Sequence, residues 1–348
     1  MRLIPLENLK LGSVLAVDIY SSTGSSIFNR GEKVTTRMLH QLKHENVHNI
    51  YITDKYCSGD KELFFISQLY SLSIAFPEIE KFIKLSIDGT ARPHTLHDVI
   101  AVSEQLICEL FKYQNRLKIR YLPEKIFSNV LIETTTNIAV NSAILAIKSG
   151  MDRDETVNVF MTALLKDIAL LSPHLKSRGH FNIHPVVGYE YLKNNYDLPQ
   201  TVLLGVLHHH ETGDGLGFPQ GLLGNSIAPY AKIIQIIEMF FALKKYYSTN
   251  VVLKAEIKDK LSNKHIKYDP IYMEKFLANL EVFPTNTIFK LNTGDIVTVV
   301  KKDKKAALFP RVRILKNYSN IYKDGALIDL DSAHGIEIVS KVYYVEED

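Results

Sequence analysis

A long succession of apolar residues at helical spacing occupies residues 121–283, and it constrains the fold more than any other feature. Apolar residues that recur every three or four positions place one face of each helix against a shared core. Gly150 ends the first of the long predicted helices. The next helix begins with an acidic turn around Asp154, which the helix dipole favours. This block predicts a helical domain.

The two ends of the chain have a different pattern. Residues 1–53 predict a small α/β unit, because the segments SVLAVDIYSS and HNIYIT are rich in β-branched and aromatic residues. Between them lies a helical segment with Thr35 or Thr36 as its N-cap. Residues 284–348 alternate apolar and polar residues with Gly and Asp turns, which predicts a small antiparallel β unit. We expect a mainly α fold divided into an N-terminal α/β unit, a helical connector, a helical domain and a β-rich extension, at residues 1–53, 54–120, 121–283 and 284–348.

Composition limits the class of protein. The chain has 348 residues, of which 46% are apolar, so it can bury a sizeable core in two or three domains. A net charge of +3 is too small to indicate a nucleic-acid or membrane partner. Cys57 and Cys108 give no disulfide framework. Because we find no signal peptide and no apolar stretch of roughly 18 residues, we expect a cytoplasmic protein without a membrane partner.

Several side chains that bind metals lie at predicted helix ends. Asp167 ends an apolar helix, where a carboxylate is either a metal ligand or half of a surface ion pair. His184 precedes Pro185, so it lies at an element boundary as a cap or a ligand. His209 and His210 are adjacent, and within a helix they would point about 100° apart. At a helix end that runs into a Gly-rich turn, both rings can bind one ion.

Glu238 lies in the almost wholly apolar segment KIIQIIEMFFAL. A buried carboxylate must be paired or bound to a metal, and both interpretations stay open here. Together, these carboxylates and imidazoles suit Fe, Mn or Zn. A divalent ion of this kind lowers the pKa of water and supplies a nucleophile at neutral pH. The residue types therefore indicate a metal-assisted hydrolase.

These motifs resemble the HD-GYP family, the helical HD-superfamily enzymes that hydrolyse cyclic di-GMP. The matching segments are KD at 166–167, HPVVG at 184–188, HHETGDGLGFP at 209–219 and the later acid Glu238. The resemblance covers nearly the whole chain, since a small N-terminal unit and a β tail often flank HD-GYP domains. It implies metal ligands at Asp167, His184, His209, His210 and Glu238. It also implies a substrate loop containing Asp214, Gly215, Gly217, Phe218 and Pro219.

The departures from the family pattern concern a second metal ion and the phosphate clamps. In the arrangement that the resemblance implies, the Asp of the HD pair bridges two ions. The residues at positions where the family has a ligand, a clamp or the Tyr of GYP are Val130, Thr134, Lys166, Ala169, Leu170, Phe218, Tyr247 and Asn250. The Asp and the three histidines that the resemblance assigns to one ion remain, whereas the other ion has lost its histidines and keeps only the later acid, Glu238. We therefore expect one divalent transition metal, Fe, Mn or Zn, and a lost second site.

Lys166 has two interpretations. Its ammonium either acts as a charge surrogate in the catalytic site, offsetting Asp167 and Glu238, or turns outward to solvent. The loss of the second metal site and of the phosphate clamps predicts a degenerate HD-GYP-type cyclic di-GMP signalling protein with weak or absent phosphodiesterase activity. It would act through nucleotide binding or protein interaction, with cyclic di-GMP, other signalling proteins or a second copy in a homodimer as partners.

Two alternatives stay open. One is an active cyclic di-GMP phosphodiesterase that uses the single retained metal ion. The other is nucleic-acid binding through the basic stretch 301–316, although a solvated hairpin turn is the simpler interpretation and no aromatic stacking pattern accompanies it.

Overall fold

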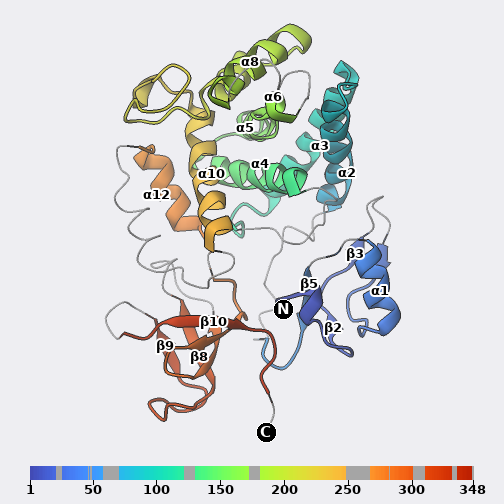
Figure 1. The fold of residues 1–348 in the computed structure, drawn as a ribbon, viewed down its shortest axis with the longest axis vertical. Coiled ribbons are helices and arrows are strands. Elements are labelled where there is room, and N and C mark those ends of the chain that lie inside the picture. The colour runs from blue at the N-terminus through green and yellow to red at the C-terminus, as the bar shows by residue number, and fades with distance from the viewer. Residues whose placement is uncertain are drawn as a thin grey trace.

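The structure is a computed structural model in which a helical bundle lies above two small β-containing units (Figure 1). It describes residues 1–20, 26–45, 47, 49–57, 70–120, 130–171, 181–247, 267–281, 283–300, 310–330 and 335–346. The helical bundle and the small antiparallel sheets near both ends of the chain confirm the predicted mainly α fold class. None of the helices in these ranges is both long enough and apolar enough to cross a membrane.

The bundle is built from helices whose ends follow local sequence signals. Asp152 caps one helix, accepting from the backbone N–H of Glu155 at 2.9 Å, and Gly150 ends the preceding one with a positive φ of 88°. The helices are α2 (Tyr70–Ile87), α3 (Pro93–Lys112), α4 (Val130–Lys148), α5 (Arg153–Leu165), α6 (Ile168–Leu171), α8 (His184–Asn195), α9 (Gln200–His208), α10 (Pro229–Tyr247) and α12 (Pro270–Asn279). Residues 252–263, which belong to the predicted helical domain, lie outside the described residues.

One hydrophobic core runs through the bundle. Its members come from the predicted connector as well as from the predicted helical domain, and they include Phe82, Leu106, Phe160, Ile234 and Phe276. Helix α5 packs against α3, α4, α9 and α10. The C-terminal end of α5, where Lys166 and Asp167 follow, is therefore held from several sides.

The N-terminal unit is a three-stranded antiparallel sheet with one helix. The sheet has the order β1 (Arg2–Pro5), β5 (Asn49–Thr53), β2 (Val14–Leu15). Helix α1 (Thr36–His44) begins at Thr35, whose side chain accepts from the backbone N–H of Met38. The segment SVLAVDIYSS contains two strands, β2 and β3 (Ile19–Tyr20). Strand β3 lies outside the three-stranded sheet and pairs with β4 (Ser26–Phe28).

The C-terminal unit is a five-stranded antiparallel sheet, as the alternation predicts. Its order is β10 (Ile338–Val342), β6 (Ile288–Leu291), β7 (Ile296–Val300), β8 (Arg311–Lys316), β9 (Leu327–Asp329). Val297, Val312 and Ile314 fill its core. Of the basic stretch 301–316, residues 301–309 lie outside the described residues, and most of the rest forms β8.

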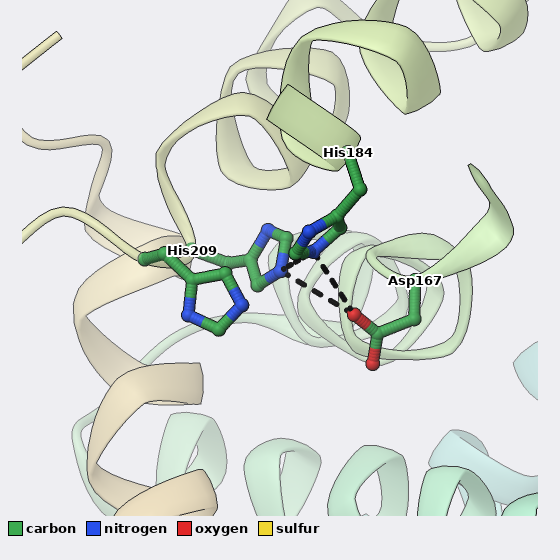
Figure 2. Close-up of side chains that lie close together, drawn as sticks. Asp167, His184 and His209 are labelled. Atoms are coloured by element: carbon green, nitrogen blue, oxygen red, sulfur yellow. Dashed lines mark hydrogen bonds and ion pairs between the residues drawn. The ribbon is translucent and has the colours of Figure 1, made fainter. Parts of the chain in front are cut away.

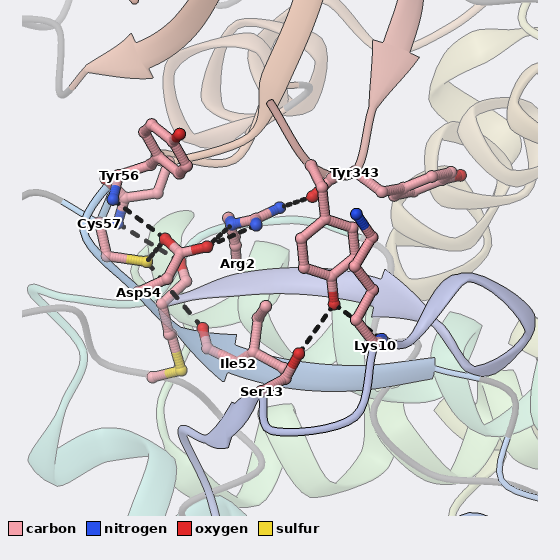
Figure 3. A network of polar contacts seen from close by, with 11 residues as sticks. Arg2, Lys10, Ser13, Ile52, Asp54, Tyr56, Cys57 and Tyr343 are labelled. Carbon is pink, nitrogen blue, oxygen red and sulfur yellow. Dashed lines mark hydrogen bonds and ion pairs between the residues drawn. The ribbon is translucent and has the colours of Figure 1, made fainter. Parts of the chain in front are cut away.

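The two ends of the chain contact each other (Figure 3). The buried Arg2 guanidinium donates to Asp54 Oδ2, with Nε at 2.8 Å, and to the Tyr343 carbonyl. The Tyr344 hydroxyl lies 2.9 Å from Ser13 Oγ. These contacts tie the last strand region to the N-terminal sheet.

Candidate metal centre

Asp167 and His184 lie at breaks between helices. Asp167 follows the end of α5, and its carbonyl accepts from the Leu170 N–H at 2.8 Å as α6 begins. His184 is the first residue of α8, after the 3₁₀ helix η3 (Phe181–Ile183). Pro185 then occupies an early helical position, where no intrahelical N–H donor is needed. Both side chains are therefore placed by the termini of rigid elements.

His209 and His210 follow the end of α9, where the Gly-rich loop begins. One ligand atom from each of Asp167, His184, His209 and His210 lies within 4.8 Å of the others. Figure 2 shows Asp167, His184 and His209 converging from separate segments. The structure thus brings together the carboxylate and the three imidazoles, including the adjacent pair at the helix end.

Hydrogen bonds to carbonyl groups fix the tautomers of two of these rings. His184 Nδ1 lies 2.6 Å from the Phe181 carbonyl oxygen, and His209 Nδ1 lies 2.6 Å from the Val206 carbonyl oxygen. Because a carbonyl only accepts, each Nδ1 carries the hydrogen, and in a neutral ring Nε2 carries a lone pair.

The two Nε2 atoms are 3.1 Å apart, and they lie 3.4 and 3.5 Å from Asp167 Oδ1. Lone pairs this close repel unless a cation lies among them. The residues present therefore fit a divalent ion, because carboxylate and imidazole are ligands of Fe, Mn and Zn.

The charges also favour a metal ion. Burial would raise the pKa of Asp167, but the Lys166 ammonium and the two nearest imidazoles hold that pKa well below its usual value. Burial lowers the pKa of His210 to about 2, and the neighbouring His209, His184 and Lys166 add to this effect. An anionic carboxylate therefore faces a neutral imidazole at neutral pH, which is the ionisation that metal ligands require.

Lys166 points inward, so of its two interpretations the structure contradicts the outward-facing lysine. Its side chain is 2% exposed, and its ammonium contacts Asp167 Oδ2 and lies 2.7 Å from Glu238 Oε1. Burial alone would lower the pKa of Lys166, but the two carboxylates outweigh it and raise that pKa. An ammonium held by two carboxylates can stay charged in the interior, which explains the inward orientation.

Glu238 lies apart from the group of converging ligand atoms. Its carboxylate contacts the Lys166 ammonium instead, and its side chain is 22% exposed. Of the two interpretations of Glu238, an ion pair or a metal ligand, the structure shows the ion pair.

Comparisons with known proteins match this region. Residues 129–271 match the HD domain family. The chain is 24% identical over 228 residues to the cyclic di-GMP phosphodiesterase PdeB of Borreliella burgdorferi. The aligned residues make up 62% of this chain and 58% of that protein. The chain is 30% identical over 128 residues to the cyclic di-GMP phosphodiesterase response regulator RpfG of Xanthomonas campestris, 33% of each chain. The HD domain at residues 129–271 and the likeness to cyclic di-GMP phosphodiesterases support the predicted resemblance to the HD-GYP family.

A third relative is the cyclic di-GMP phosphodiesterase PA4108 of Pseudomonas aeruginosa, with 25% identity over 137 residues, 38% of this chain and 32% of that protein. The match thus spans 58% of PdeB and about a third of each of the other relatives. The four converging residues Asp167, His184, His209 and His210 are called the metal group below. All four lie within residues 129–271, so the matched HD domain contains the metal group.

The Gly-rich loop after α9 is closed by Glu211, whose role could not be predicted from the sequence. Glu211 is fully buried, and its carboxylate accepts from the backbone N–H groups of Gln220 at 2.6 Å and Leu222 at 2.8 Å. At Gly217 an added Cβ would lie 2.3 Å from the Thr212 nitrogen. The loop returns on itself at this point, which explains why an acid and a glycine occur here.

The predicted substrate-loop residues surround this closure. Asp214 Oδ1 accepts from the Leu216 N–H at 3.1 Å, and hydrogen bonds from Thr212 and Leu216 lower the pKa of Asp214. Gly215 has a positive φ of 75°. The Phe218 ring stacks on His210 with centroids 4.7 Å apart, and a cis peptide bond joins Phe218 to Pro219. The loop is thus attached directly to the metal group.

The residues at the other departures lie on nearby helices. Thr134 is in α4, and Ala169 and Leu170 are in α6. Tyr247 ends α10, and Asn250 lies outside the described residues. A further residue that the sequence analysis missed is Phe181, whose ring lies 4.9 Å from that of His184. Its position three residues before a predicted ligand was the only sequence signal.

Proposed function

We propose that this HD-GYP protein binds one divalent transition metal and cyclic di-GMP, and that it has weak or no phosphodiesterase activity. It would act in signalling through nucleotide binding or through contact with other proteins. The relatives' names supply the nucleotide, and the retained Asp167, His184, His209 and His210 supply the metal ligands.

The position of Lys166 carries this proposal. Asp167 directs Oδ1 toward the imidazoles and Oδ2 toward the Lys166 ammonium. If the family arrangement applies, a bridging carboxylate would offer that second oxygen to a second ion. Here a fixed positive charge lies beside it and also contacts Glu238, so both acids are already compensated.

Replacing an ion by an ammonium changes the chemistry. A bound metal ion supplies Lewis-acid charge to phosphodiester oxygens, and a pair of ions stabilises both the attacking and the leaving oxygen. Lys166 can offset charge, but its contacts with two carboxylates hold it in place. By analogy, loss of a single hydrogen-bond donor that stabilises a transition state typically costs about 10²–10³ in rate. We expect the combined losses, including the phosphate clamps, to leave little turnover.

A second candidate is an active phosphodiesterase that uses one metal ion. The convergence of four donor groups within 4.8 Å favours it, because one divalent ion is enough to generate a nucleophile from water.

Binding and turnover assays with metal-loaded protein separate the two candidates. We expect cyclic di-GMP to bind, as measured by calorimetry, and product to stay near the uncatalysed level in a chromatographic assay. Rapid product formation that His210→Ala abolishes would support the active enzyme instead. Absence of both binding and turnover would refute the proposed ligand.

A further inference from the structure

An aromatic ring, that of Phe181, borders the candidate metal centre and is largely exposed to solvent. Phe181 lies in η3, is 58% exposed and belongs to none of the core clusters that the described residues form. Its ring centroid is 5.7 Å from that of His210 and 6.2 Å from that of Phe218. The carbonyl of the same residue accepts the hydrogen bond from His184 Nδ1, which fixes its backbone relative to the metal group.

Packing within the protein does not account for this exposure. An exposed benzyl side chain forgoes much of the free energy that burial of its apolar surface would give. Phe218 differs, because it is half-buried and stacks on His210 with an interplanar angle of 29°. Two aromatic rings from separate segments therefore border the partly exposed imidazole of His210, and Phe181 has the larger part of its surface open to a ligand.

A nucleotide has the chemistry that such a border would recognise. Its phosphate is attracted to a metal ion, and its base is a flat aromatic system that stacks on a side-chain ring. A phosphate near His210 would leave the base of the same nucleotide a few bonds away, and Phe181 lies immediately beside His210. We propose that Phe181 stacks against one base of the cyclic dinucleotide, so that it positions the ligand without touching the metal. This inference rests on the proposed function, which names the ligand.

Calorimetry with metal-loaded, full-length protein tests the stacking. Loss of one base–aromatic stack is worth about 1–3 kcal/mol, so we expect Phe181→Ala to weaken cyclic di-GMP binding roughly 5- to 150-fold. Phe181→Tyr should bind like the wild type, whereas Phe181→Leu, which is apolar without a ring face, should resemble the alanine variant. Metal content by elemental analysis and the affinity for inorganic phosphate should be unchanged in all three variants.

The outcomes distinguish this inference from the proposed function. Wild-type protein that binds no cyclic di-GMP would overturn both. If the wild type binds and Phe181→Ala or Phe181→Leu binds equally well, the stacking role is wrong and the proposed function stands. If Phe181→Ala loses metal or phosphate affinity as well, Phe181 supports the metal group and does not stack a base.

Discussion

At the scale of single residues, removal of the buried Lys166 should lower the stability of the protein. Its ammonium is buried between Asp167 and Glu238, so Lys166→Ala would leave two carboxylates without their shared partner. Breaking a buried ion pair from one side typically costs about 3–5 kcal/mol. We expect a loss of that size in the free energy of unfolding, measured by urea denaturation. Lys275→Ala, at an exposed position of α12, is the control and should change it by less than about 0.5 kcal/mol. Equal losses in the two variants would contradict the buried ion pair.

The pKa of His210 predicts how metal-free protein responds to acid. Because folding lowers this pKa from 6.5 to about 2, only the unfolded chain binds a proton at this ring between those values. The free energy of unfolding should therefore fall as the pH is lowered below about 6.5. His210→Asn should show a smaller slope between pH 6.5 and 5 in metal-free denaturation curves. Identical slopes would show that the ring titrates normally in the folded protein.

At the scale of elements, the Gly-rich loop depends on close backbone contact. A Cβ at position 217 would lie 2.4 Å from the Glu211 Cα, so Gly217→Ala must push the backbone apart. Overpacking of this kind costs about 1–3 kcal/mol, and the displaced loop should also lower metal affinity through His210. Gly224→Ala is the matched control, since its added Cβ would meet nothing nearer than 3.9 Å. Denaturation midpoints and metal titrations of both variants test this, and a tolerated Gly217→Ala would contradict the loop geometry.

The elements differ in how far the sequence predicts them. Helix ends were predictable, because Gly150, Thr35 and the turn after Asp152 act through local backbone contacts. The short strands β1 and β9 were not predicted. Strand β1 forms by pairing with the distant strand β5, and the three-residue β9 forms by pairing with the preceding strand β8. The same distinction holds for the site. The motif indicated the residues of the metal group, whereas the direction of Lys166 depends on Glu238 in α10, which no local pattern reveals.

At the scale of the whole molecule, Arg2 connects the two ends of the chain. Arg2→Met keeps most of the apolar stem but removes the hydrogen bonds to Asp54 and to the Tyr343 carbonyl. Hydrogen bonds to charged groups are worth about 1.5–3 kcal/mol, so we expect a loss of that order in the free energy of unfolding. Arg311→Met is the control, because Arg311 pairs with Asp329 at an exposed site, with side chains 42% and 38% exposed.

Thiol labelling provides a second measurement of the same contact. Cys57 Sγ lies 3.5 Å from Asp54 Oδ1, so release of Asp54 should increase the rate at which a thiol reagent modifies Cys57. Cys108, in α3, is the internal control and should react at an unchanged rate. Unchanged labelling of Cys57 in Arg2→Met would show that the contact does not hold this region.

The number of metal ions per chain tests most directly whether Lys166 takes the place of the second ion that the family resemblance implies. Protein loaded with excess Mn²⁺, Fe²⁺ or Zn²⁺ and then desalted can be measured by elemental analysis against protein concentration. Since one carboxylate and three imidazoles converge while Lys166 compensates the remaining oxygen of Asp167, we predict one tightly bound ion per chain. Two ions per chain would contradict this prediction.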